Sequence, residues 1–131
     1  MPGIESKILD LIDRYNVREH SLITSFWPPI LAKFKELASD LKLGVLCNIW
    51  DEEFLDIANR LNAYAILPDY RLVNEDIISK SHETGLKVIV WTVDNIDEAR
   101  VLLESGVDGI ITNDPLAIKL ALQLTNNSNT Y

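Results

Sequence analysis

Five short runs of apolar and β-branched residues recur along this 131-residue chain, and a helical pattern follows each of them. The runs cover residues 21–25, 43–47, 63–67, 87–93 and 107–112. The uninterrupted apolar run Val88-Ile89-Val90 is typical of a strand that is buried on both faces of a parallel sheet. Parallel neighbours need a crossover connection, which is usually a helix. The sequence therefore predicts an α/β fold of five parallel βα units, preceded by one helix.

The first helix is predicted from apolar residues that recur at helical spacing. These residues are Ile4, Ile8, Leu11, Ile12 and Tyr15. Spacings of three and four place them on one face of an amphipathic helix. The N-caps predicted for later helices are Asp51, Asn74, and either Asp94 or Asn95. One domain is expected over residues 1–124, and a frayed polar tail over residues 125–131.

This order of elements is compatible with a doubly wound open sheet or with part of a (β/α)8 barrel. In both architectures, the carboxyl ends of the strands form the rim that faces a ligand. Trp91 lies at the end of the fourth predicted strand, where an exposed indole can form the floor for an apolar group. Asn113 follows the fifth, at a strand-to-helix turn that can bind phosphate through backbone N–H groups. Packing under a loop and ordinary helix capping are the alternative interpretations.

Other kinds of site find no support in the sequence. It contains no glycine-rich phosphate loop and no Gly-x-Ser-x-Gly elbow, and its single cysteine excludes an internal disulfide. The acidic residues at 51–53 and 94–98 are explained by helix capping and the helix dipole, so no metal ligand is predicted. Asp69, which follows a strand end, is a still weaker candidate for a metal ligand. We expect His82 to pack on an apolar helix face and Cys47 to be a buried structural thiol.

The net charge is −8, from 12 basic and 20 acidic residues. A broad basic face for nucleic acid or for an anionic membrane is therefore not expected.

No apolar run approaches the roughly 18–20 residues that cross a bilayer, and no signal peptide is recognised. A cytoplasmic location is the simplest expectation. Met1-Pro2-Gly3 is compatible with a natural start or with the boundary of a shortened chain.

Two segments resemble the glycerophosphodiester phosphodiesterase family. Residues 85–94, Gly-Leu-Lys-Val-Ile-Val-Trp-Thr-Val-Asp, are similar to its glycine, strand and Trp-Thr-Val-Asn segment, with Asp94 in place of the usual Asn. Residues 106–115 resemble its closing Gly-Val-Asp-Gly-Ile-Ile-Thr segment. Ser25-Phe26 matches a Ser-Phe at an earlier strand end, and His82 matches a common histidine. The resemblance extends from residue 4 to about residue 120.

The resemblance covers only the second half of the family. It implies a partial TIM barrel, in which the five strands correspond to the fourth to eighth strands of a (β/α)8 barrel. Family members cleave glycerophosphodiesters to glycerol 3-phosphate and an alcohol, with a divalent cation such as Mg2+ or Ca2+. The resemblance implies that Phe26, Trp91 and Asn113 line the substrate pocket. The family's His-Arg-Gly motif, cation-binding carboxylates, second catalytic histidine and Glu-x-Lys strand have no counterpart in this sequence.

Hydrolysis without a cation or a basic clamp leaves the developing phosphoryl charge unsupported. We therefore expect this chain alone to be inactive, with no catalytic residue and no cofactor of its own. A half-barrel exposes two sheet edges, so we expect a homodimer or a partner chain that supplies the missing strands. The alternative functions are binding of a small phosphorylated ligand and completion of another chain's barrel. An unrelated receiver-like module would need an acidic cluster at the end of the first strand, where Ser25-Phe26 stands.

Overall fold

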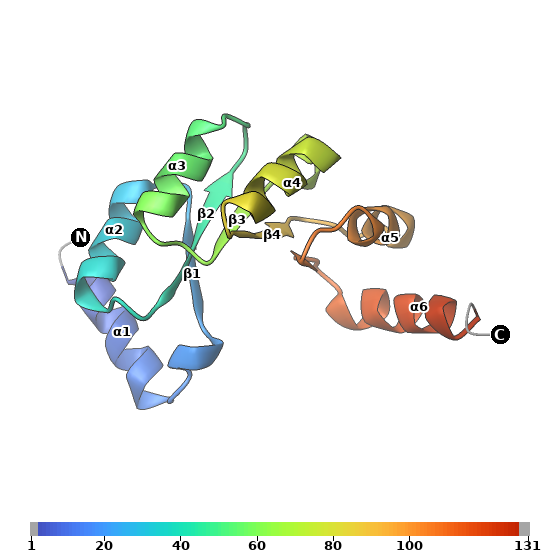
Figure 1. Ribbon diagram of the computed structural model, residues 1–131. Coiled ribbons are helices and arrows are strands. Elements are labelled where there is room, and N and C mark those ends of the chain that lie inside the picture. Colours follow the sequence, from blue (N-terminus) through green and yellow to red (C-terminus); the bar gives the residue numbers. More distant parts are fainter. Residues whose placement is uncertain (1–2, 129–131) are drawn as a thin grey trace.

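The computed structural model describes residues 3–128, and its helices and strands alternate in the predicted order (Figure 1). The strands are β1 (Leu22–Ser25), β2 (Lys42–Cys47), β3 (Ala65–Pro68), β4 (Lys87–Val90) and β5 (Gly109–Ile110). The helices are α1 (Ile4–Arg14), α2 (Pro28–Leu37), α3 (Glu53–Arg60), α4 (Glu75–Glu83), α5 (Ile96–Glu104) and α6 (Pro115–Ser128). Two short 3-10 turns, η1 (Arg18–His20) and η2 (Tyr70–Leu72), precede β1 and follow β3.

The five strands form one parallel sheet in the order β1-β2-β3-β4-β5. The register aligns Ser25 with Val45, Val45 with Ile66, and Ile66 with Val88. The predicted set of five parallel βα units after one helix is therefore confirmed. Every residue of the central strand β3 is buried, whereas β1 and β5 are only partly covered. Within residues 3–128, each of these two terminal strands pairs on one side only.

The core lies between the sheet and the helices that cover one of its faces. Helix α2 packs on β1 and β2, α3 on β2 and β3, and α4 on β4. Leu31 of α2, Val45 of β2 and Val88 of β4 are almost fully buried within this layer. Complete burial of such a side chain contributes about 1.5–3 kcal/mol, so the core is strongest at the middle of the sheet.

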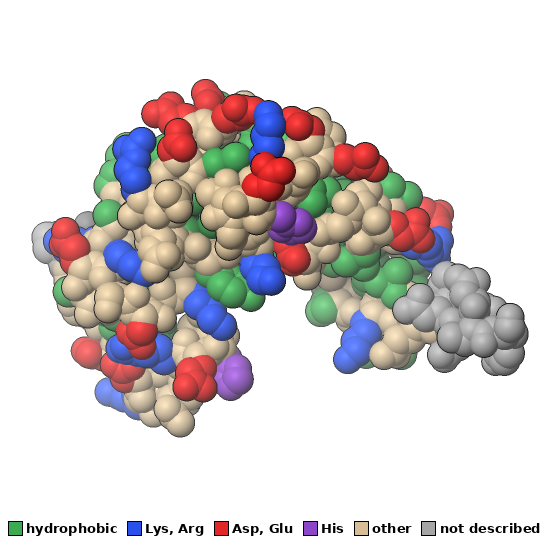
Figure 2. All heavy atoms as spheres, viewed as in Figure 1, with side chains coloured by type: hydrophobic (Ala, Val, Ile, Leu, Met, Phe, Trp, Pro, Cys, Tyr) green, Lys and Arg blue, Asp and Glu red, His purple; other side chains and the backbone are tan. Residues whose placement is uncertain are grey.

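The molecule has the shape of an arch (Figures 1 and 2). The helices α1 and α2 form one arm, α5 and α6 form the other, and α3 and α4 lie across the top. The space-filling view shows a wide hollow between the two arms. The sheet therefore curves without closing on itself. Across the described residues, no helix is long and apolar enough to cross a membrane.

The strand limits agree with the prediction to within two residues for β1, β2 and β3, whereas β4 and β5 are much shorter than predicted. Strand β4 ends at Val90 instead of residue 93, and β5 is confined to Gly109–Ile110. After Val90 the chain leaves the regular ladder, and Trp91 pairs through a single bridge with Asp69. Val93 is buried although it lies outside the sheet. The apolar run in the sequence is therefore longer than the strand itself. Helix α6 reaches Ser128 and so includes the start of the expected polar tail, while residues 129–131 lie outside the described part.

The helix caps agree with the sequence at two positions. The side chain of Asn74 accepts the N–H of Ile77 at 2.8 Å, and that of Asn95 accepts the N–H of Glu98 at 3.0 Å. The prediction of Asp51 as an N-cap is wrong by one position, because Glu52 is the N-cap of α3, although Asp51 does accept the N–H of Glu53 at 2.8 Å. Of the two candidates for the N-cap of α5, Asn95 is therefore the cap, and Asp94 is bound elsewhere.

Helix α1 does not bury the whole apolar face that its sequence predicts. Of the predicted stripe only Ile12 is buried, together with Leu9 beside the stripe, because this side of α1 faces α2 and the core. The remaining apolar residues of the stripe are exposed. They are Ile4, Ile8, Leu11 and Tyr15. The physical reason is the position of α1 at one end of the arch, where it has a helical neighbour on one side only.

Candidate functional site

Two aromatic side chains meet at the carboxyl end of the sheet. Phe26 follows β1 and Trp91 follows β4, and their ring centroids are 5.8 Å apart with an interplanar angle of 87°. Two other strands separate β1 from β4, so this contact spans the concave side of the sheet. An edge-to-face pair of this kind contributes about 0.5–1.5 kcal/mol beyond its buried area. Phe26 remains 51% exposed, so the pair offers an apolar surface at the rim.

The chain around Trp91 is fixed by main-chain contacts with the neighbouring strand. The indole Nε1–H donates to the oxygen of Leu67 at 2.7 Å, and the N–H of Tyr70 donates to the oxygen of Trp91 at 3.0 Å. The peptide bond between Trp91 and Thr92 is cis. Both hydrogen bonds connect the end of β4 to the end of β3, so the indole has one defined orientation against the sheet.

A buried carboxylate next to Trp91 is neutralised by an arginine. Asp69 is 7% exposed, and its two oxygens accept Arg71 Nε at 3.0 Å and Nη2 at 2.6 Å. The Arg71 side chain holds the pKa of Asp69 below its usual value, against the opposing effect of burial. The same pairing raises the pKa of Arg71, whose side chain is exposed. Arg71 was not among the predicted site residues, although Asp-Tyr-Arg at a strand end could have indicated this pair.

The predicted site residue Asn113 is bound to an acidic residue. Its main-chain N–H donates to Asp94 Oδ1 at 2.8 Å, and its side-chain Nδ2 donates to Asp94 Oδ2 at 2.9 Å. Thr112 Oγ1 also donates to Asp94 Oδ1 at 2.8 Å. The N–H of Asn113 and the hydroxyl of Thr112 lower the pKa of Asp94. Asp94 therefore anchors the turn between β5 and α6, and a ligand contact of Asn113 stays a prediction.

The structure corrects the expected packing role of His82. Its side chain is 40% exposed and its Nε2 lies 2.7 Å from Asp108 Oδ2, which also accepts the N–H of Val88 at 2.7 Å. Burial opposes ionisation of Asp108, but the hydrogen bonds from Val88 and His82 outweigh it and lower its pKa. His82 and Asp108 connect α4 to the amino ends of β4 and β5, which is the end of the sheet opposite Trp91.

Cys47 is the buried thiol that the sequence predicts. It is 1% exposed, and burial raises its pKa to about 12. A reactive or metal-binding cysteine needs its thiolate, which this environment strongly disfavours. Cys47 is therefore a packing residue of β2.

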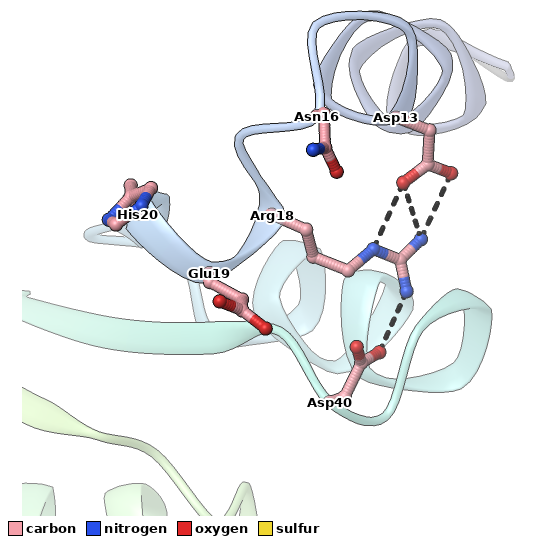
Figure 3. Close-up of a pocket in the computed structure, with 6 residues that line it drawn as sticks. All are labelled: Asp13, Asn16, Arg18, Glu19, His20 and Asp40. Atoms are coloured by element: carbon pink, nitrogen blue, oxygen red, sulfur yellow. Dashed lines mark hydrogen bonds and ion pairs between the residues drawn. The ribbon is translucent and has the colours of Figure 1, made fainter.

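A polar pocket of about 400 Å³ lies before β1 and β2, at their amino ends (Figure 3). Figure 3 shows the Arg18 guanidinium between the carboxylates of Asp13 and Asp40, with bonds of 3.0 and 2.8 Å. The single positive charge of Arg18 is shared between the two carboxylates, and these ion pairs connect α1, η1 and the turn before β2. Among residues 3–128, no group of three or more His, Cys, Asp or Glu side chains is placed to hold a metal ion.

Comparison with known proteins decides the family. The family model described as the glycerophosphoryl diester phosphodiesterase family matches residues 3–117. The chain belongs to this family. A glycerophosphodiester phosphodiesterase of Caldanaerobacter subterraneus is 36% identical over 114 residues, which are 87% of this chain and 47% of that relative. The dermonecrotic toxin LlSicTox-alphaIII2 of Loxosceles laeta is 32% identical over 101 residues, which are 76% of this chain and 33% of the toxin.

Solved structures show the same fold. A glycerophosphodiester phosphodiesterase from Parabacteroides distasonis has a TM-score of 0.78 at 17% identity, covering 93% of this chain and 51% of its own. A phosphodiesterase from Oleispira antarctica, solved with its product sn-glycerol-3-phosphate, has a TM-score of 0.74 at 20% identity. The match covers 78% of this chain and 41% of the Oleispira chain. The chain thus spans between 33% and 51% of the length of these four relatives. Its open sheet is a partial (β/α)8 barrel, as the sequence predicts.

Proposed function

We propose that this chain forms the apolar wall of a glycerophosphodiester site and that its 131 residues do not hydrolyse such substrates by themselves. The contact between Phe26 and Trp91 is the observation that carries the proposal. It places two aromatic rings on the concave side of the rim, where ligands of α/β barrels bind. The C–H groups of a glycerol moiety pack well against aromatic faces, whereas its hydroxyls need polar partners.

The proposed lack of hydrolysis rests on how the rim carboxylates are used. Both oxygens of Asp69 accept bonds from Arg71, and both oxygens of Asp94 accept bonds from Thr112 or Asn113. A divalent cation such as Mg2+ or Ca2+ requires several free oxygen ligands. Asp69 and Asp94 are thus already used within the chain, and among the described residues no three ligating side chains are grouped for a metal, so no step of the reaction is assigned to a cation held by this chain. Hydrolysis would use charged groups from the missing strands.

The chain is accordingly expected to work with further barrel strands, supplied by a second copy or by another chain. A cytoplasmic location remains the expectation from the sequence. Binding of a small phosphorylated ligand without hydrolysis is compatible with the same aromatic wall, and one set of measurements tests both functions.

The test combines an activity assay with a binding assay. We expect no product from glycerophosphocholine with added Mg2+ or Ca2+, and we expect glycerol 3-phosphate to change the tryptophan fluorescence of the chain. Trp91→Ala should abolish this response, while Trp27→Ala, at a residue that is 62% exposed, should retain it. Hydrolysis by the purified chain would contradict the proposed inactivity. A response that survives in Trp91→Ala would contradict the proposed wall.

A further inference from the structure

Two apolar grooves lie at the two ends of the sheet. The first has a volume of about 430 Å³ and lies along β1, between α1 and α2; its apolar lining includes Ile4, Ile8, Leu22, Ile23, Ile30 and Phe34. The second has a volume of about 300 Å³ and lies along β5, between α5 and α6; its apolar lining includes Leu103, Ile110, Pro115, Ile118 and Leu122. Both grooves therefore adjoin the terminal strands of the sheet.

The exposed apolar side chains are distributed in the same way. Among the described residues, the large exposed hydrophobic side chains come from residues 4–37 and 96–120, with only Ile49 and Tyr64 between them. Helix α1 contributes Ile4, Ile8 and Leu11, which are 49%, 36% and 50% exposed. Their spacing is that of one helical stripe, a pattern that normally packs against another element. The two ends of the arch thus carry apolar surface that the middle of the molecule buries.

Each groove combines apolar pockets with an unpaired strand edge. Within residues 3–128, β1 pairs only with β2 and β5 only with β4. The outer edges therefore present main-chain donors and acceptors beside an apolar surface. A further strand that adds to such an edge gains main-chain hydrogen bonds and places its side chains in the adjoining pockets. Each groove is therefore suited to a strand that continues the sheet.

The curvature of the sheet determines how many strands fit between the arms. The glycerophosphodiester phosphodiesterase from Parabacteroides distasonis superposes on 93% of this chain with a TM-score of 0.78, so the five strands have the curvature of an eight-stranded barrel. The gap in such a barrel is three strands wide. A second copy of this chain would bring five strands, whereas a complete (β/α)8 barrel needs only three more. More than half of the Caldanaerobacter relative lies outside the matched region.

We propose that both grooves are docking surfaces for one partner segment of three parallel βα units, from the first half of a chain of this family. One of its terminal strands pairs with β1 beneath α1, and the other pairs with β5 beside α6. The inference rests on the proposed function, because it names the partner that completes the site beside Phe26 and Trp91.

The test co-expresses the full chain with the part of the Caldanaerobacter relative that lies outside the match. We expect light scattering to give the mass of a one-to-one complex, and hydrogen exchange to slow at the amides of β1 and β5 while the buried strand β3 is unchanged. Ile8→Glu and Leu103→Glu, one in each groove, should each weaken association by at least about tenfold. Leu37→Glu is the matched control, since Leu37 is 47% exposed and lines neither groove. Circular dichroism checks that all three variants fold.

Four results would overturn the docking proposal. They are the absence of any complex, a dimer of this chain that excludes the added segment, protection of only one sheet edge, and equal weakening by Leu37→Glu. The binding of glycerol 3-phosphate separates this proposal from the proposed function. A one-to-one complex whose ligand response survives in Trp91→Ala contradicts the aromatic wall alone. A chain that forms no complex but loses the response in Trp91→Ala contradicts the docking alone.

Discussion

The indole N–H of Trp91 donates a hydrogen bond of 2.7 Å to the main-chain oxygen of Leu67. This bond connects the end of β4 to β3, while Phe26 reaches the same ring from the end of β1. Three strands therefore determine where the indole lies. A ring that is already oriented loses little conformational freedom when a ligand packs on it, which favours binding. The position of Trp91 is set by the sheet and does not depend on a ligand.

Replacing Trp91 with phenylalanine should test this anchoring. Trp91→Phe keeps an aromatic ring but removes the donor to Leu67, so we expect the free energy of unfolding to fall by about 1–3 kcal/mol. Urea unfolding followed by circular dichroism measures the change. Trp27→Phe is the control, and its exposed ring should leave stability within about 0.5 kcal/mol. Equal losses in the two variants would show that the bond to Leu67 contributes nothing.

The pair of Asp69 and Arg71 predicts a dependence of stability on pH. Arg71 lowers the pKa of Asp69 in the folded chain, whereas an unfolded aspartate titrates near about pH 3.9. A lowered pKa contributes stability above the unfolded value, and this contribution disappears as the pH falls through the folded value. We expect Arg71→Ala to be destabilised at pH 6 and to approach the wild type in strong acid. Arg71→Lys, which keeps the charge but not the two-bond geometry, should lie between them at pH 6.

Asp108 should be a stronger determinant of stability than its partial exposure indicates. Asp108→Ala removes the acceptor of the Val88 N–H and the partner of His82, so we expect a loss of about 1–3 kcal/mol. Thermal unfolding measures it. Asp97→Ala is the control, because its side chain is 87% exposed and surface pairs such as that with Arg100 contribute about 0–1 kcal/mol. A loss no greater than that of the control would contradict the role of Asp108 as an anchor.

The fold and the rim were predictable to different extents. Apolar runs without alternation indicate parallel strands, because both faces of such strands are buried, and five of them were found in order. The limits of β4 and β5 were not predictable from composition, since Val93 is apolar and buried but lies beyond the ladder. Trp91 was identified from its place at the end of a predicted strand, and Phe26 from a family resemblance. Their contact spans 65 positions of sequence and four strands, so local spacing could not reveal it.

Other differences arise from partners that are distant in the sequence. A histidine on the edge of a helical stripe fits a packing role equally well, and Asp108, which lies 26 residues from His82, decides against it. Asp94 could cap α5, but Thr112 and Asn113 offer it three donors from the next strand end. The exposure of the apolar stripe of α1 has a different cause. The pattern correctly predicts an amphipathic helix whose apolar face would pack against other apolar residues. The described part of the chain supplies that contact on one side only.

Gly44 should be intolerant of any side chain. A Cβ atom built at this position in β2 meets Cδ1 of the fully buried Leu67 and lies 3.1 Å from Cγ2 of Thr24. Gly44→Ala should therefore cost about 1–3 kcal/mol through overpacking. Gly109→Ala in β5 is the matched control, since its nearest contact is an ordinary 3.6 Å to Ile89 and its stability should be close to that of the wild type. Denaturant unfolding of both variants distinguishes a close approach from a general cost of replacing glycine.

The burial of Cys47 has a practical consequence for chemical labelling. Its thiol is 1% exposed, with a pKa of about 12, and thiol-directed reagents react with the thiolate. At neutral pH the folded chain should therefore remain unmodified by a maleimide, although it contains a cysteine. A second cysteine introduced at the exposed Thr24 of β1 would be the one that carries a fluorophore or a spin label. The native sequence can thus host a single-site probe at its own sheet edge without first being made cysteine-free.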